Sequence, residues 1–540
     1  MLRLNELKLP LEHPPEALEQ AVIERLGLGP GELLSWRIVR RGHDARRRGA
    51  IRLVYSLDLA LRDEDAALVR HAALTRAPEA CYRPVALPPP PLLRPVVIGA
   101  GPCGLLAALV LAQLGLRPLI LERGRIVRRR TVDTFAFWRR AELTPESNVQ
   151  FGEGGAGTFS DGKLYSQVSD PHQYGRKVLQ TFVQAGAPAE ILVVAKPHIG
   201  TFRLVSMVES LRASIEALGG EYRFESQVTR FHLDTGANGR HRIEALELAD
   251  GSTIAARQVV LAIGHSARDS FEALHAAGIA MHAKPLSIGV RIEHPQSLID
   301  AARFGPQAGH KLLGAADYKL VHHASGGRGV YSFCMCPGGT VVAAASELGG
   351  VVTNGMSQYS RAERNANAGI VVGLQPGDFA LHANGFDPGG PLAGIGFQRH
   401  WERRAFVVGG GDYRAPAQRV GDFLAGRAST TLGAVIPSYK PGVTPADLAA
   451  CLPDFATVAI REALPHFDRR IPGFALADAV MTGVETRTSS PLRIPRGEDG
   501  QSLNTEGLFP AGEGAGYAGG ILSAAIDGIR AAEAVARALA

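Results

Sequence analysis

Residues 95–124, PVVIGAGPCGLLAALVLAQLGLRPLILERG, contain the pattern that decides the fold of this chain. A short apolar run at residues 96–98 predicts a buried strand, which enters a glycine turn at residues 99–104. An apolar helix pattern follows over residues 105–114, and a second strand pattern covers residues 118–121. Strand, turn, helix and strand in this order predict a βαβ unit with parallel strands.

The glycines of this turn have the spacing GxGxxG, and each has a separate physical role. Gly99 allows the tight turn, Gly101 lets the backbone approach a pyrophosphate, and Gly104 lets helix and strand pack closely. The start of the helix offers free N–H groups and a partial positive charge to phosphates. Glu122, at the end of the second strand, is placed to accept hydrogen bonds from a ribose. Because all these parts occur in register, the sequence predicts a dinucleotide-binding site rather than a glycine-rich surface turn.

The composition is that of a globular chain. Its 540 residues, 46% hydrophobic and 20% charged, are enough for two or three domains. The longest apolar stretch, near Leu105, is too short and too interrupted to span a bilayer, and the N-terminus lacks the apolar core of a signal peptide. Five cysteines do not make a disulfide framework, so we expect a cytoplasmic location.

The chain is basic, with a net charge of +6 and arginine clusters at residues 40–41, 46–48 and 128–130. A basic balance of this kind fits a solvated surface, an anionic substrate or a nucleic-acid partner. We favour the solvated surface over nucleic acid, because no basic stripe with interleaved aromatic residues accompanies the clusters.

The chain divides where its patterns change. Residues 1–86 predict a small α+β module, and residues 87–94 form a proline-rich linker. Residues 95–271 predict the first part of a Rossmann-like domain. Residues 272–500 lack regular βαβ repetition and predict an inserted mixed α+β substrate or cap domain. Residues 501–540 return to the first domain with a short strand and an alanine-rich helix. The predicted fold class is therefore α/β.

A glycine-rich loop at residues 152–163 forms a second candidate for ligand contact. So many glycines indicate a sharp turn or a close approach of the backbone to another group. The neighbouring Phe151, Phe159 and Tyr165 favour an ordered binding loop over a mobile surface loop, because flexible linkers carry few large residues.

Several separated segments resemble one family of flavoproteins. They are the glycine fingerprint with Glu122, the strand 259–263 that ends in Gly264, and the segments 148–164 (NVQFGEGGAGTFSDGKL), 332–339 (SFCMCPGG), 352–357 (VTNGMS), 508–513 (LFPAGE) and 514–521 (GAGYAGGI). Together they resemble the uncharacterised FAD-dependent dehydrogenases, also described as NAD(P)/FAD-dependent oxidoreductases, of the two-dinucleotide-binding-domain flavoprotein superfamily. The resemblance covers about residues 90–540 and implies the fold and an FAD cofactor, while it specifies no substrate.

The resemblance also implies which residues hold the cofactor. The predicted cofactor-binding residues are Gly99, Gly101, Pro102, Gly104, Glu122, Arg123, Gly154, Gly155, Gly157, Thr158, Asp161, Lys163, Gly264, Gly512, Glu513, Gly519, Gly520 and Ile521. Glu513 takes the place of the more usual Asp and would reach the ribityl or pyrophosphate region. Residues 519–521 would bring the start of the last helix to the pyrimidine edge of the flavin, where it stabilises the negative charge of the reduced ring.

No second glycine fingerprint opens a βαβ unit after residue 130. We therefore expect a single dinucleotide domain, in which NAD(P)H, as an electron donor, would visit the flavin only transiently.

Two cysteines form a CxC pattern in a predicted strand. At a period of two residues, Cys334 and Cys336 should point to one face, either as a redox or metal pair or as packed apolar side chains. Packing is the favoured interpretation, and no metal site is predicted, because two thiols supply only half of a structural zinc site. Cys103 in the glycine turn is interpreted in the same way, as a packed small residue in preference to a redox thiol.

Four further side chains are candidates for contact with ligand. His265 and Arg268 follow the predicted buried strand at residues 259–263, where they either face the flavin or cap the turn. Lys163 and Arg291 are candidates for neutralising a substrate carboxylate or the flavin charge. No residue is assigned a catalytic role.

The sequence thus predicts an FAD-dependent oxidoreductase, a dehydrogenase or reductase that transfers a hydride between flavin N5 and an organic substrate with an anionic or polar group. No membrane partner is expected. An alternative from another class is an RNA-associated flavoprotein in which residues 46–48 contact phosphates, and it predicts salt-sensitive RNA binding. A flavin reductase that acts on a partner protein is a third possibility.

Overall fold

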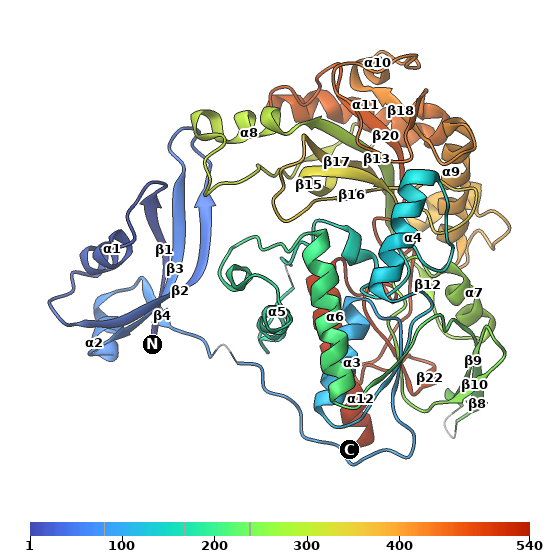
Figure 1. Ribbon diagram of the computed structural model, residues 1–540, viewed down its shortest axis with the longest axis horizontal. Coiled ribbons are helices and arrows are strands. Elements are labelled where there is room, and N and C mark those ends of the chain that lie inside the picture. Colours follow the sequence, from blue (N-terminus) through green and yellow to red (C-terminus); the bar gives the residue numbers. More distant parts are fainter. Residues whose placement is uncertain (80, 167, 237–238) are drawn as a thin grey trace.

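The structure is a computed structural model that describes residues 1–79, 81–166, 168–236 and 239–540 (Figure 1). Its central sheet has the strand order β23-β11-β5-β6-β7, and every neighbouring pair is parallel. These strands are Leu508–Pro510, Val259–Leu261, Val96–Ile98, Leu119–Leu121 and Glu221–Arg223. The first four consist of buried residues, as expected for a parallel sheet that is covered on both faces. The predicted α/β class with a Rossmann-like sheet is confirmed.

Two helices from opposite ends of this domain pack closely beside the sheet. They are α3 (Pro102–Gln113) and α12 (Ile521–Leu539), and Figure 1 shows them together with α6 (Thr201–Ala217). Residues 103–112 of α3 are all buried, which explains why the sequence there is apolar on every side. A β-carbon on Gly528 of α12 would lie 2.1 Å from the Cys103 carbonyl oxygen, so this helix pair depends on a glycine at the contact.

Antiparallel strands follow the helix α6 and extend the same domain. The remaining elements of this part are α4 (Val127–Arg140), α5 (Tyr174–Gln184), β8 (Val228–Thr235), β9 (His241–Leu248), β10 (Thr253–Ala255), α7 (Arg268–Ala276) and β22 (Thr505–Glu506). The strand β9 pairs with β8, β10 and β22, so that the end of the chain joins a sheet built from its middle.

A second, eight-stranded sheet lies above the first in Figure 1, with the strand order β14-β15-β17-β13-β20-β18-β19 and β16 paired to β15. Its strands are β13 (Leu286–Pro295), β14 (Val321–His323), β15 (Gly329–Ala343), β16 (Thr353–Met356), β17 (Asn365–Leu374), β18 (Ala415–Arg419), β19 (Val443–Pro445) and β20 (Val480–Glu485). The accompanying helices are α8 (Gln296–Phe304), α9 (Ala393–Gly409), α10 (Val420–Leu424) and α11 (Asp454–Arg470). The short pair β12 (His282–Ala283) and β21 (Leu492–Arg493) stands next to the points where the chain enters and leaves this sheet.

The N-terminal part is a four-stranded sheet of order β2-β3-β1-β4 with two helices. Its elements are β1 (Leu2–Pro10), α1 (Ala17–Leu26), β2 (Leu33–Asp44), β3 (Arg52–Leu61), α2 (Glu64–Arg70) and β4 (Leu74–Arg76). The long β2–β3 hairpin reaches toward α8, where the Ile51 N–H donates to the Gln307 side chain at 2.9 Å (Figure 1).

Within the described residues, no helix is long and apolar enough to cross a bilayer. The predicted domain limits stay predictions.

Candidate active site

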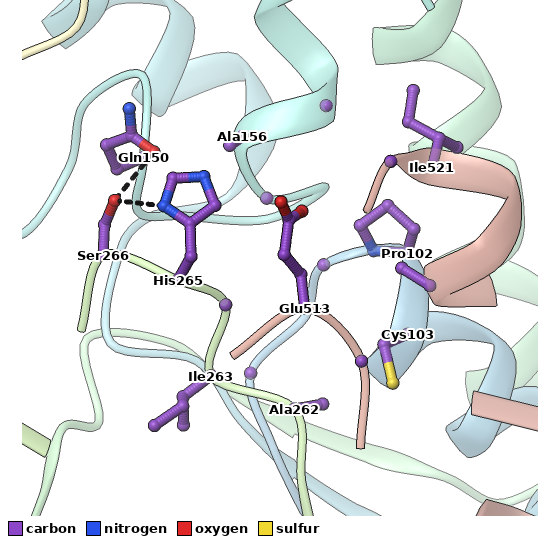
Figure 2. A pocket seen from close by; sticks show the side chains of 18 of the residues that line it. Pro102, Cys103, Gln150, Ala156, Ala262, Ile263, His265, Ser266, Glu513 and Ile521 are labelled. Carbon is purple, nitrogen blue, oxygen red and sulfur yellow. Dashed lines mark hydrogen bonds between the residues drawn. The ribbon is translucent and has the colours of Figure 1, made fainter. Parts of the chain in front are cut away.

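A cavity of about 570 Å³ opens at the carboxyl ends of β5, β11 and β23, between the two large sheets. It brings together most of the residues that the sequence singles out. Those that line it are Gly99, Gly101, Pro102, Glu122, Arg123, Gly155, Gly157, Asp161, Lys163, Gly264, Gly512, Glu513, Gly519, Gly520 and Ile521. Three predicted residues, Gly104, Gly154 and Thr158, do not line it. Figure 2 shows Pro102, Glu513 and Ile521 around this space.

The glycine turn has the geometry of a cradle for a ligand. Gly99 has a φ of +99°, and a β-carbon there would lie 2.4 Å from the Ala262 carbonyl oxygen. A β-carbon on Gly104 would lie 1.8 Å from the Gly99 carbonyl oxygen, so Gly104 lets the helix start close to the turn. Gly104 therefore shapes the cradle from behind, which explains why it does not face the cavity.

Glu122 ties the two glycine segments together. Its buried carboxylate accepts hydrogen bonds from the N–H groups of Ala100 at 2.8 Å, Gly124 at 2.8 Å and Gly152 at 3.0 Å. A carboxylate has about four lone-pair positions, so capacity is left for a sugar hydroxyl on the cavity side. The sequence predicted that this residue contacts the ligand. The structure shows that it also holds the glycine turn at residues 99–104 next to the loop that begins at residue 152.

The loop at residues 152–163 is anchored by a buried arginine of α4. Arg130 donates to the carbonyl oxygens of Asn148, Val149 and Glu153, each at 2.8 Å. A β-carbon on Gly152 would lie 2.4 Å from the Arg130 side chain, so a glycine is required here. This anchoring explains why Gly154 and Thr158 are buried. It also favours the ordered binding loop, and not the mobile surface loop, that the sequence left as alternatives.

Asp161 and Lys163, at the end of this loop, are both held by ion pairs or hydrogen bonds. Asp161 pairs with Arg361 at 2.5 Å and with Lys163 at 3.1 Å. Burial raises the pKa of Asp161, but the Lys163 and Arg361 cations outweigh burial and lower it to about 2. Lys163 also donates to the Met335 carbonyl oxygen of β15, which ties the loop to the second sheet.

Glu513 and His265 point into the middle of the cavity (Figure 2). Burial raises the pKa of Glu513 to about 7, against the lowering effects of Lys284 and of the Gly520 N–H. Burial, together with the Arg487 and Arg268 cations, lowers the pKa of His265 to about 4, so this imidazole is neutral at pH 7. One carboxyl that titrates near neutrality and one neutral imidazole thus lie in the same space.

A stability prediction follows from the raised pKa of Glu513. A carboxyl whose pKa is higher in the folded protein stabilises the fold at low pH, and this contribution decreases as the pH rises through about 7. In the protein without FAD, we expect Glu513→Gln to gain stability relative to the natural chain between pH 5 and 8, by roughly 2 to 3 kcal/mol. Unfolding in urea at several pH values measures the difference. A difference that stays constant over this range would contradict the raised pKa.

Arg291 and Arg268 are bound to protein partners and do not line the cavity. Arg291 pairs with Glu485 at 2.6 Å, and Arg268 pairs with Glu402 at 2.7 Å; both guanidinium groups are buried. One of Lys163 and Arg291 was expected to neutralise a ligand charge, and of these two only Lys163 lines the cavity. Both arginines are committed to buried carboxylates, because a buried charge needs a partner.

The cavity also contains residues that the sequence did not single out. These are Ser226 and Gln227 at the end near Glu122, and Lys319 at the end near Lys163. They come from segments without any motif, and only the packing of the two sheets brings them here. Outside the cavity, His322, Glu462 and His466 place ligand atoms within 4.8 Å of one another, a group that the sequence also did not indicate.

Comparison with known families agrees with this geometry. Residues 93–271 match a family described as "Pyridine nucleotide-disulphide oxidoreductase", residues 285–488 match "FAD-dependent protein, C-terminal domain-like", and residues 1–60 match a domain of unknown function. A Clostridium beijerinckii protein described as "Uncharacterized protein" is 44% identical over 536 residues, which is 98% of either chain.

Similar solved structures are much more distant. The structure of CtdE in complex with FAD has 13% identity and a TM-score of 0.30 over 81% of this chain and 82% of its own. Glycine oxidase from Geobacillus kaustophilus has 12% identity and a TM-score of 0.31 over 82% of this chain and 94% of its own. Similarities at this level carry no information on chemistry.

The fold and the glycine-lined cavity define a flavoprotein of the Rossmann type. The chain belongs to the family of FAD-dependent oxidoreductases that includes the Clostridium beijerinckii protein. The residues present fit FAD, since glycines whose β-carbons would collide with backbone shape the turn, and the start of α12 faces the cavity.

Proposed function

We propose that the protein holds FAD along this cavity and transfers a hydride between flavin N5 and a small organic substrate with an anionic group. The observation that carries this proposal is the continuity of the cavity. It runs from the glycine turn, suited to a pyrophosphate, to an end lined by Lys163 and Lys319. A single space therefore accommodates both a dinucleotide and a second, negatively charged molecule.

The cofactor end would be held mainly by backbone groups. The N–H groups at the start of α3 and α12 and the positive ends of these helices face the cavity and favour phosphate and the anionic reduced flavin. Arg123 closes the end near Glu122, where its guanidinium lies 4.1 Å from the centre of the Phe151 ring and pairs with Asp269 at 2.8 Å.

When bound, FAD supplies the hydride chemistry, and the protein supplies orientation and proton handling. Lys163 is fixed by Asp161 and the Met335 carbonyl oxygen, so its charge stays at one place in the cavity. The Glu513 carboxyl, with a pKa raised by burial to about 7, holds or releases a proton near neutral pH. A nicotinamide donor would have to enter the same cavity, because no second glycine fingerprint after residue 130 opens a βαβ unit.

The first test is the visible spectrum of the purified protein. We expect flavin absorbance, and bleaching of this absorbance under anaerobic conditions by members of a panel of small carboxylic acids or by NAD(P)H. A colourless protein that does not take up added FAD would overturn the proposal.

Lys319 provides a test of the anionic substrate. Its side chain lies at the cavity lining and carries no part of the glycine cradle. We expect Lys319→Met to raise the concentration of a carboxylate that half-saturates the bleaching by about tenfold, which corresponds to about 1.4 kcal/mol. Lys311→Met, an exposed neighbour outside the lining, is the matched control and should behave as the natural chain. Equal half-saturation in both variants would count against an anion site at this end.

A further inference from the structure

Cys334 and Cys336 are separated by a bulge in β15. The pairing of β15 with β17 shifts between Phe333 and Cys336, and Cys334 has a φ of +42°. In a regular strand both thiols would point to one face. Here Cys334 lines the cavity, while Cys336 is completely buried behind it. Such a bulge reorients one side chain relative to its neighbours, and bulges of this kind are common next to active sites.

Two cations and one thiol contact the backbone next to the Cys334 side chain. Lys163 binds the carbonyl oxygen of the intervening Met335, and Arg291 donates to the Cys334 carbonyl oxygen at 3.1 Å. The Cys336 thiol donates to that same carbonyl oxygen at 3.4 Å, which places Cys336 directly behind Cys334. The hydrogen bond from Cys336 and the two cations lower the pKa of Cys334, while the pKa of Cys336 is raised. Of the two thiols, Cys334 is therefore the one that ionises more readily and the better nucleophile.

This arrangement depends on a glycine of the neighbouring strand β16. A β-carbon on Gly355 would lie 2.9 Å from the Cys336 sulfur and 2.2 Å from the Arg291 side chain. The other cysteines have different surroundings. Burial raises the pKa of Cys451 to about 12 and raises that of Cys103 well above its ordinary value, as expected for packed, neutral thiols.

We propose that Cys334 and Cys336 form a reactive thiol pair at the substrate end of the cavity, which takes small anionic disulfides as substrates. The inference rests on the proposed function and names its substrate class. Lys163 and Lys319 provide the positive charge that an anionic disulfide requires. The pair lies outside residues 93–271, which match the disulphide oxidoreductase family and contain Cys103 as their one cysteine.

The exchange balances in two steps. The Cys334 thiolate attacks one sulfur of the substrate, forms a Cys334–substrate disulfide and releases the first thiolate. The Cys336 sulfur then attacks the Cys334 sulfur, forms the Cys334–Cys336 disulfide and releases the second thiol, which takes up the Cys336 proton. The substrate gains the two electrons that the pair loses. Return of the disulfide to one thiolate and one thiol takes two electrons and one proton, which reduced flavin would supply when FAD is bound. A disulfide between residues so near in the chain is strained, and strained disulfides are readily reduced.

The test uses 5,5′-dithiobis(2-nitrobenzoate), an anionic disulfide whose released thiolate is coloured. In the full chain with FAD bound and with Cys81→Ser to remove the exposed thiol, we expect two coloured ions per chain and no retained label. Cys336→Ser should release one ion and retain the label on Cys334. Cys334→Ser should release none. At about pH 6 the reaction of Cys334 should be about 100-fold faster than that of the exposed Cys81 in a Cys334→Ser chain.

The matched control is Cys451→Ser, a buried cysteine outside the cavity lining, which should leave the release unchanged. Release that does not depend on Cys334, or a stable label on Cys334 in the presence of Cys336, would overturn the inference. Its failure is separate from that of the proposed function. Release of the coloured ions needs no flavin chemistry, whereas the proposed function fails when the protein does not bind FAD.

Discussion

Replacing Gly101 with alanine is expected to weaken FAD binding strongly and to leave the fold intact. Gly101 has φ −77° and ψ −176°, which alanine adopts without strain. A β-carbon there would lie 3.6 Å from the Gly155 α-carbon, an ordinary contact. On the cavity side, however, the new methyl group occupies the space through which the backbone approaches a pyrophosphate. We expect the affinity for FAD to fall by about 100-fold or more, roughly 2.7 kcal/mol.

Titration of the protein stripped of FAD measures this affinity, and its thermal unfolding checks the fold. Gly326→Ala is the matched control, since Gly326 is exposed, has no positive φ and has open space around a β-carbon. Gly104→Ala offers a contrast, because its β-carbon would lie 1.8 Å from a carbonyl oxygen and should lower stability as well. Binding of FAD to Gly101→Ala with the affinity of the natural chain would refute the placement of the pyrophosphate.

Replacing Arg130 with methionine is expected to destabilise the protein by about 3 kcal/mol or more. The substitution keeps most of the buried volume but leaves the carbonyl oxygens of Asn148, Val149 and Glu153 without their donor. Each buried polar group left unpaired costs roughly 1 to 3 kcal/mol. Because these carbonyl groups belong to the glycine-rich loop and its approach, the loop should also loosen and the affinity for FAD should decrease.

Urea unfolding gives the change in the free energy of unfolding. Arg129→Met is the control on the same helix, and we expect it to change stability by less than about 0.5 kcal/mol, since Arg129 is exposed. A loss of stability of similar size in both variants would show that the helix surface, and not the anchoring of the loop, is responsible.

The parts of the fold that could be predicted are those encoded by local patterns. The apolar run at residues 96–98, the spacing of Gly99, Gly101 and Gly104, and Glu122 after the second strand are all short-range features, and the structure has the predicted βαβ unit. Arg291 illustrates the limit. Its charge is visible in the sequence. Its partner Glu485 lies far along the chain, so the sequence did not indicate that Arg291 forms a buried ion pair.

The geometry of the cysteine pair was likewise not predictable from the sequence. Regular alternation places Cys334 and Cys336 on one face of the strand, whereas the bulge in β15 turns Cys334 toward the cavity and leaves Cys336 behind it. A bulge arises from the pairing of a strand with its neighbours, here β17, which the residues of β15 alone do not specify.

The sequence by itself determined the class of fold, the cofactor and most of the cradle, because a phosphate-binding turn depends on residues that are neighbours in the chain. Only the tertiary structure decided which side chains share the cavity with that cradle. Lys319, Cys334 and Arg487 come from the second sheet and the loops that join it, and they meet the glycine turn only when the two sheets pack against each other. The set of side chains around the cavity therefore depends on contacts between distant segments, which no local pattern records.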